Sequence, residues 1–407
     1  MTSPSQAGLF RNTFIRSILL SGVFLQIGIW VRNFAILLFV MEQTNNDPFA
    51  VSLISVAEFA PIFLFSFVGG TFADRWRPKR TMVWCDVLSA LSVFVVLLTL
   101  LAGTWKAVFF ATLVSAILSQ FSQPSAMKLF KQHVPEEQLQ SGMAMFQTLM
   151  AIFMIIGPIL GTFVYQSFGI HTAIGVMGVA FLLSAGVLTF LPADDKEAKD
   201  KTDSSFWQEL IDGFRYVWAR PMLRSLGAVF AIAGLAVGLM QPLVVFIVME
   251  RLGLPKEYVQ WLMMVNGAAM LIGGGLVVGI SKKVSPQKLL ALGMLASAVS
   301  VCGIGLSTNL WLTLAFEFVS GLFFPCIHIG VNTMILQASE EAYVGRVNGV
   351  LNPLFMGMMV LAISTAGWLK AALSLVTVFE AAGLLFLLGM FVLIPLFKMK
   401  PTAAEQT

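Results

Sequence analysis

Charged residues are scarce in this sequence, and a few stand inside long apolar runs. Arg32 and Glu58 occupy the first two runs, each roughly 15–18 Å from the same end at the rise of an α-helix. Ionisable side chains at such depth in a bilayer usually face a cavity and carry function. We expect these two to pair, with Glu58 binding and releasing a proton and Arg32 modulating its proton affinity. A static ion pair that joins two helices is the alternative.

Three further titratable side chains stand in later apolar runs. Glu317 and Glu380 lie roughly 10–12 Å from the same end of their helices. Both side chains can reach water at the rim of a bilayer, whereas Glu317 is also placed to attract a cationic ligand. Histidine titrates close to neutral pH in water, so His328 is either a titrating group or a hydrogen-bonded packing residue.

The elements that position these side chains follow from composition. Of the 407 residues, 58% are hydrophobic and 11% are charged, whereas about a quarter of the residues of a soluble domain are charged. A bilayer core of about 30 Å needs about 20 apolar residues per helix. We therefore predict an all-α polytopic membrane protein with twelve transmembrane helices, over 15–41, 48–73, 81–103, 106–127, 141–165, 170–192, 222–249, 258–281, 288–307, 310–336, 346–369 and 372–397.

The basic residues predict the orientation. With alternate loops assigned to opposite sides, the 25 Lys and Arg residues fall almost entirely on the side of the two termini. Arg32 lies within a span, and the few on the other side are Lys106, Arg251, Lys256 and Lys370. By the positive-inside rule, both termini are expected to face the cytoplasm. The net charge of +4 thus reflects topology and implies no nucleic-acid partner.

A polar stretch divides the spans six and six. The expected domains are an N-terminal six-helix bundle over 1–191, a cytoplasmic linker with an amphipathic helix over 192–222, a C-terminal six-helix bundle over 223–397 and a cytoplasmic tail over 398–407.

The two halves repeat with an offset of 208 residues. Pro78 falls on Pro286, and the segment LSALSV that starts at Leu88 falls on ASAVSV, which starts at Ala296. By the same offset Glu58 falls on an amide, Asn266, which does not titrate. Internal repeats of this kind are typical of secondary transporters.

The loop between the second and third spans reads GGTFADRWRPKR from Gly69. It resembles the signature loop of the major facilitator superfamily, a Gly, three residues, Asp-Arg and a basic cluster, and the matching residues are Gly70, Asp74, Arg75, Lys79 and Arg80. The resemblance implies a gating loop, with Asp86 of the third span paired to Arg80 or Arg75. A basic loop that only determines topology is the alternative. The loop of the second half has Lys282 in place of the acid.

A second motif lies in the fifth span. GPILG, with Gly157, Pro158 and Gly161, resembles the core of the antiporter motif of drug exporters, although Thr162 replaces its last Gly. Proline bends a helix and small residues let a neighbour pack closely, so an ordinary kinked helix is the alternative. Together with QPSAMKLFKQHVPEEQL and GRVNGVLN, the motif resembles the macrolide-efflux branch of the drug:proton antiporters, which also includes siderophore exporters.

The resemblance implies a fold and a transport cycle. Two pseudo-symmetric six-helix bundles of the major facilitator fold would flank a substrate cavity, and the polar residues on its helices are Gln26, Trp30, Asn33, Gln147, Gln241, Asn266 and Glu317. The implied function is proton-coupled efflux of amphipathic or cationic small molecules by alternating access. Export of a siderophore or a lipid-like metabolite, uptake by symport, and a non-transporting membrane sensor are the alternatives.

Other classes of protein lack their signatures in this sequence. No GxxxxGK[ST], HExxH or GxSxG occurs, so we expect neither ATP drive nor an enzyme, and neither a cofactor nor a metal is implied. The expected partners are a small-molecule substrate, protons and the lipid bilayer. The resemblance implies a monomer in a bacterial inner membrane.

Overall fold

A computed structural model describes residues 13–134, 136–191, 206–280 and 283–397. The description covers the backbone alone at positions 13, 66–75, 136–137, 206–207, 209, 278, 341–342 and 396. Within the described residues the chain is helical without strands, and it falls into two compact units, bounded as Met1–Asn46 with Ala57–Asp200 and as Asp47–Val56 with Lys201–Thr407.

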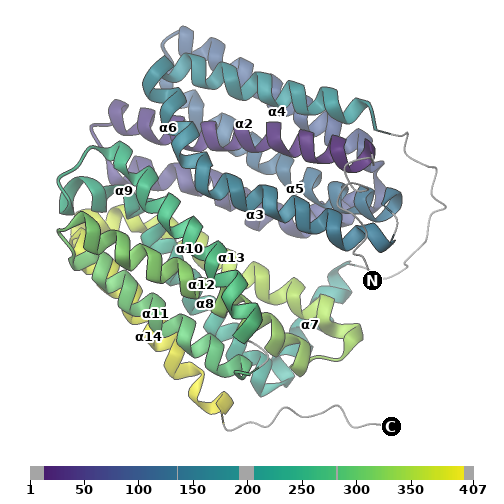
Figure 1. The fold of residues 1–407 in the computed structure, drawn as a ribbon, viewed down its shortest axis with the longest axis vertical. Helices are drawn as coiled ribbons and strands as arrows, with labels where there is room; N and C mark the ends of the chain where they lie inside the picture. Colours follow the sequence, from purple (N-terminus) through teal and green to yellow (C-terminus); the bar gives the residue numbers. More distant parts are fainter. Residues whose placement is uncertain (1–12, 135, 192–205, 281–282, 398–407) are drawn as a thin grey trace. The chain divides into compact units, whose positions relative to one another are not determined.

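The first unit is built from long helices (Figure 1). They are α2 (Thr13–Gln43), α3 (Pro48–Arg75) from Ala57 onward, α4 (Pro78–Leu101), α5 (Val108–His133) and α6 (Glu136–Thr189). Helix α6 packs against α2 and α4, and α4 packs against α5. Phe14, Leu129, Phe130 and Leu188 are among the side chains of a buried apolar cluster that joins these helices.

Helix α6 contains two of the predicted spans. Its backbone breaks at Gly169, where φ is 73° and ψ is −179°, and glycine adopts a positive φ without steric cost. Eleven helices in the described part of the chain are long and apolar enough to cross a membrane. Because α6 has 54 residues, and one crossing needs about 20, it supplies two crossings, which confirms the prediction of twelve.

The second unit contains the remaining helices. They are α7 (Phe206–Ala219), α8 (Pro221–Met240), α9 (Val244–Phe246), α10 (Val259–Ile280), α11 (Pro286–Leu306), α12 (Leu310–Ala338), α13 (Glu341–Ala372) and α14 (Leu375–Val392). The span predicted over 222–249 is interrupted after α8. A 3-10 turn at Gln241–Leu243 contains Pro242, and the span ends after α9 in a π-helical turn at Ile247–Arg251. Proline lacks the N–H that a regular helix needs.

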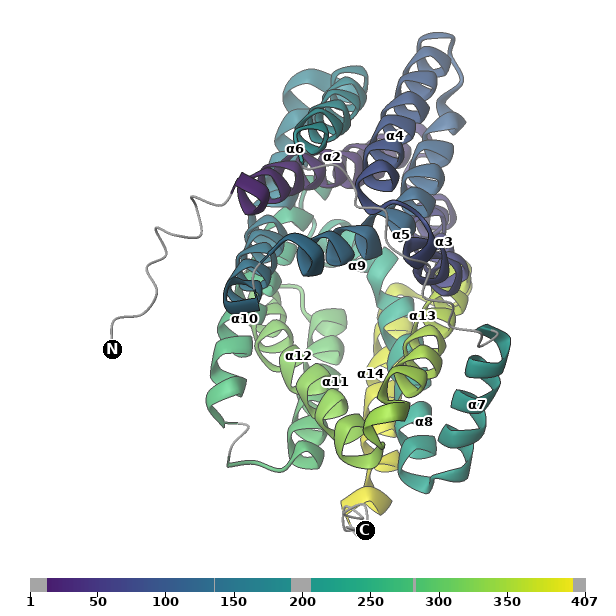
Figure 2. The same cartoon turned by 90° about the vertical axis from the view of Figure 1, so that its right-hand side faces the viewer.

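Helix α7 is the part of the predicted amphipathic linker that the structure describes, since 192–205 lie outside the described residues. It packs against α8 and α13 (Figure 2). Val217 is buried, and the ring of Tyr216 stacks on Tyr343 of α13 with centroids 4.2 Å apart. Phe214 and Trp218 of the same helix are exposed.

The third spans of the two halves, α4 and α11, have the same buried face. Each begins with proline at its first turn, where the missing N–H costs nothing. Nine buried positions of α4 correspond to nine of α11 at the offset of 208. They are Thr81, Met82, Cys85, Asp86, Ser89, Ala90, Ser92, Val93 and Val96, matched by Leu289, Leu290, Gly293, Met294, Ser297, Ala298, Ser300, Val301 and Ile304. The structure therefore confirms the internal repeat.

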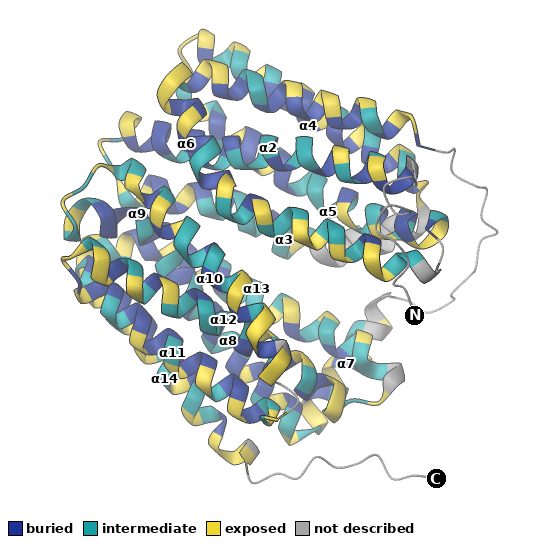
Figure 3. Ribbon diagram, viewed as in Figure 1, coloured by how far each residue is buried: buried dark blue, intermediate teal, exposed yellow. Residues whose placement is uncertain are grey.

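Many large apolar side chains of both units are exposed. Leu64, Leu98, Phe163, Leu361 and Leu384 are examples that are more exposed than buried. Figure 3 marks exposed positions in yellow along the helices of each unit. Soluble proteins rarely expose apolar patches of this extent. Bilayer hydrocarbon is the solvent that such a surface requires.

Candidate functional site

A buried polar cluster joins α2, α3 and α5 around Arg32. Its Nη2 lies 3.4 Å from Glu58 Oε1, and its Nη1 donates to Ser115 Oγ at 2.7 Å. Its Nε donates to Asn33 Oδ1 at 2.9 Å, and Asn33 Nδ2 donates to Glu58 Oε1 at 3.0 Å. The structure thus brings together the two residues that the sequence predicted to pair, and it adds Asn33 and Ser115.

The two charged partners differ in exposure. The Arg32 side chain is 5% exposed and the Glu58 side chain is 22% exposed. Besides Glu58, the side-chain atoms that accept hydrogen bonds from Arg32 are Ser115 Oγ and Asn33 Oδ1. Arg32 is therefore held by α5 and by its own helix as well as by the carboxylate.

A second buried carboxylate lies in the second unit. Glu317 of α12 is 5% exposed, and its Oε2 accepts a hydrogen bond from Asn266 Nδ2 of α10 at 2.9 Å. Sequence reasoning placed Glu317 either in a cavity or at the rim of the bilayer. Its burial against α10 does not match the rim alternative, because a side chain that reaches interfacial water stays accessible.

Asp86 of α4 has a different partner from the one that the resemblance implied. It is 3% exposed, and its Oδ2 accepts a hydrogen bond from Ser184 Oγ at 2.6 Å. The Ser184 hydroxyl lies 2.8 Å from that of Ser21. Arg80 is exposed in the first turn of α4, about 9 Å along the helix from Asp86, and the Arg75 side chain lies outside the described residues.

Most of the predicted gating loop also lies outside the description. The side chains of Gly70, Asp74 and Arg75 are not among the described ones. Lys79 is described, and its Nζ donates to the carbonyl oxygens of Thr189 at 2.9 Å and Leu191 at 2.5 Å. Carbonyl groups at a helix end attract cations, so Lys79 ties the start of α4 to the end of α6.

The glycines of the GPILG motif face α2. A Cβ on Gly161 would lie 2.5 Å from the carbonyl oxygen of Trp30 and 2.8 Å from Cβ of Phe34. A Cβ on Gly157 would collide with the Trp30 ring. Glycines spaced four apart let two membrane helices approach closely. The motif therefore lets α6 pack against α2, with Pro158 between the two glycines.

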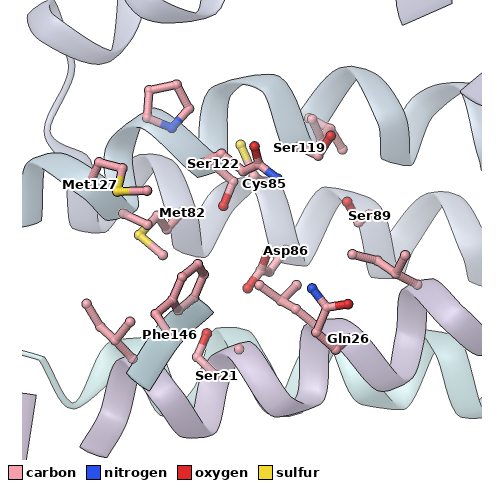
Figure 4. Close-up of a pocket in the computed structure, with 18 of the residues that line it drawn as sticks. Ser21, Gln26, Met82, Cys85, Asp86, Ser89, Ser119, Ser122, Met127 and Phe146 are labelled. Carbon is pink, nitrogen blue, oxygen red and sulfur yellow. The ribbon is translucent and has the colours of Figure 1, made fainter. Parts of the chain in front are cut away.

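A cavity of about 450 Å³ lies inside the first unit, between α2, α4, α5 and α6 (Figure 4). Gln26 and Gln147 line it, as expected for substrate-cavity residues, and so does Asp86. Trp30 and Asn33 are not part of its lining. The other predicted cavity residues belong to the second unit, namely Gln241, Asn266 and Glu317.

The sequence also matches a known family. The family model described as Major Facilitator Superfamily matches residues 18–249 and 226–407. The chain belongs to the major facilitator superfamily. Members of this superfamily carry small-molecule substrates across membranes, so the protein is a multi-pass membrane transporter and not an enzyme.

Relatives within the superfamily match most of the chain. The MFS-type transporter YkuC of Bacillus subtilis is 26% identical over 361 aligned positions, and the match covers 86% of this chain and 83% of that protein. Multidrug efflux pump Tap of Mycolicibacterium fortuitum is 25% identical, over 85% of this chain and 87% of its own. Multi-drug resistance efflux pump PmrA of Streptococcus pneumoniae is 26% identical, over 73% and 72%.

Solved structures of the superfamily share the fold. A crystal structure of nucleoside transporter NupG has a TM-score of 0.76 and covers 96% of this chain and 100% of its own. Its sequence is 12% identical. This likeness supports two pseudo-symmetric six-helix bundles, as the sequence predicted for a major facilitator transporter.

Sequence reasoning missed the serines around Asp86. Ser21 and Ser184 are 163 residues apart, and their contact depends on how α2 packs against α6. The available signal was the repeat, because LSALSV and ASAVSV place small polar residues on one face of the third span in each half. That pattern identifies the buried face of this superfamily member but not the partner helix.

Proposed function

We propose that the protein is a proton-coupled exporter of amphipathic or cationic small molecules, of drug or macrolide type, that works by alternating access. The relatives named multidrug efflux pumps support export, since Tap matches 85% of the chain. The observation that carries proton coupling is the position of Glu58, a partly accessible carboxylate that shares its Oε1 between Arg32 and Asn33 within the spans.

Proton binding at Glu58 would act on the contact between α2 and α3. The ionised carboxylate attracts Arg32 across these two helices, and a protonated one does not. Arg32 would then remain on α5 through Ser115. One proton would thereby shift the balance between two arrangements of three helices, which is how a ligand selects a conformation.

The basic residues support an orientation with both termini in the cytoplasm, in a bacterial inner membrane. In this orientation the loop from Gly70 to Arg80 lies on the cytoplasmic side, where the resemblance gives it the role of a gate. The contact of Lys79 with the end of α6 supports a structural part for its basic cluster. We propose a monomer as the transporting unit.

The test is proton-driven uptake of ethidium into inverted membrane vesicles. The wild type is expected to accumulate the dye when the vesicle interior is acidic and to stop when the gradient is collapsed. Glu58→Gln keeps the shape of the side chain but cannot ionise, so its uptake should fall to that of vesicles without the protein. Glu257→Gln makes the same change at a half-buried carboxylate outside the cluster and should behave as the wild type.

Three outcomes would contradict parts of this proposal. Unchanged proton dependence in Glu58→Gln would remove Glu58 from the coupling. Dye movement in the same direction as the proton would indicate symport, which would mean uptake in the cell. Absence of transport for ethidium and for a wider panel of cationic and macrolide compounds would favour the sensor alternative.

A further inference from the structure

Among the described residues, the cavity of the first unit is lined by a carboxylate without a basic side chain beside it. Among its 24 lining residues in the described chain, Asp86 is the carboxylate, and none is Lys, Arg or His. A carboxylate surrounded by low-dielectric material has lost its water and gains strongly from a cation nearby. The lining itself supplies no such cation.

One oxygen of the Asp86 carboxylate, Oδ1, is available to a ligand. In the described part of the chain, Ser184 is the side chain that donates to it, at Oδ2, and Ser21 lies behind Ser184. The two hydroxyls orient the carboxylate from the α2 and α6 side. Oδ1 receives no hydrogen bond from the described side chains, and Figure 4 shows Asp86 among the side chains that line the cavity.

The walls suit the body of an organic molecule. Three phenyl rings and three thioethers line the cavity, from Phe130, Phe146, Phe181, Met82, Met127 and Met150. Aromatic faces attract cations, and flexible methionines adapt to different shapes. Gln26 Nε2 donates a hydrogen bond to Met150 Sδ at 2.6 Å. Because a thioether sulfur is a weak acceptor, a polar group of a ligand can replace it as the partner of this amide.

The internal repeat shows which residue occupies the position of Asp86 in the second half. Asp86 corresponds to Met294 of α11, which is 0% exposed and lies where a side chain on Gly389 of α14 would meet it. The same buried face thus forms in the second half without a carboxylate. Packing of this face therefore does not by itself call for the carboxylate of the first half, and burying one is costly.

We infer that this cavity binds a monovalent organic cation, with the Asp86 carboxylate as its counter-ion and the aromatic and thioether walls around its apolar body. The inference rests on the proposed export of cationic molecules and names the site for them. The volume of about 450 Å³ falls within the range of about 300–1,000 Å³ typical of small-molecule sites. One carboxylate matches one positive charge, whereas a site for calcium gathers several oxygen ligands.

The test measures ethidium binding to the purified full chain in nanodiscs, by fluorescence anisotropy and without a proton gradient. The wild type should bind ethidium, and benzyltrimethylammonium should displace it while the neutral benzyl alcohol should not. Asp86→Asn should weaken binding by about tenfold or more, as expected when a buried charge loses its partner. Asp212→Asn is the matched control, because it makes the same change at an exposed carboxylate of α7.

A second variant guards against misfolding. Asp86→Met copies the residue of the second half, and it should also lose ethidium binding while remaining folded. Unchanged affinity in a folded Asp86 variant, or a wild type that binds no ethidium, would overturn the inference. Binding that depends on Asp86 without proton-driven transport would leave the site standing and remove the proposed function. Proton-driven transport by the wild type together with unchanged ethidium binding in Asp86→Asn would remove the site and leave the proposed function standing.

Discussion

Helices α4 and α11 present the same buried face to their neighbours and differ at its centre. In α4 the central position is Asp86, which accepts a hydrogen bond from Ser184 and lines a cavity. In α11 it is Met294, which fills the space beside Gly389. The shared positions therefore account for packing in both halves. The position that differs is where a specific role of the first half is to be sought.

A second comparison concerns the contact between the first and fifth spans of each half. In the first half the glycines are on the fifth span, where Gly157 and Gly161 of α6 face α2. In the second half they are on the first span, where Gly234 and Gly238 of α8 face the backbone of α13. Both pairs have the spacing that allows close helix approach. The contact is conserved within the molecule although the glycines have changed helix.

The largest effect is expected from placing the acid in the second half. Met294→Asp would bury a carboxylate in a position filled by a thioether, and the residues that correspond there to Ser21 and Ser184 at the offset of 208 are Val229 and Val392. Buried charges without partners cost about 3 kcal/mol or more. The melting temperature in detergent should fall sharply, or folded protein should be lost altogether. Met294→Leu conserves volume and is the control, with an expected cost below about 1.5 kcal/mol.

The comparison between α4 and α11 depends on this loss of stability. A Met294→Asp protein as stable as Met294→Leu would mean that both halves accept a carboxylate at this position equally. The difference between α4 and α11 would then carry no information about function.

A smaller effect is expected at the glycine contacts. Gly161→Ala places a methyl group 2.5 Å from a carbonyl oxygen of α2, and such overpacking costs about 1–3 kcal/mol. Gly238→Ala should cost a similar amount, because its methyl group would meet the Met359 carbonyl of α13. Gly175→Ala is the control on α6, where a Cβ meets nothing within 4 Å, and alanine should raise helix stability by up to about 1 kcal/mol.

Thermal unfolding of the three alanine variants in one detergent measures these differences. Destabilisation by Gly161→Ala without destabilisation by Gly238→Ala would show that the two contacts are not equivalent. The GPILG motif would then contribute to the stability of the first half in a way that the internal repeat does not explain.

The features that depend on distance along one helix were predictable from the sequence. The depths of Arg32 and Glu58 follow from the helical rise, and the two residues meet in the structure. The partners of Asp86 and Glu317 were not predictable, because Ser184 is 98 residues from Asp86 and Asn266 is 51 from Glu317. Serine and asparagine are common in spans, and only packing between helices selects one of them. The cavity has the same origin, since its volume is set by side chains from α2, α4, α5 and α6 together.

The smallest effect on stability is expected for the reciprocal change, Asp86→Met. The variant removes a buried charge and inserts the residue that the second half uses at this place, so the free energy of unfolding should change by no more than about 1 kcal/mol, in either direction. The side chain has room, because the position borders the cavity. Melting temperature and ethidium affinity should be measured on the same preparation. Stability that stays while affinity falls would assign Asp86 to binding, because a structural carboxylate would lower both. A large loss of stability would instead assign it to the fold, and the comparison between α4 and α11 would then describe two solutions to one packing problem.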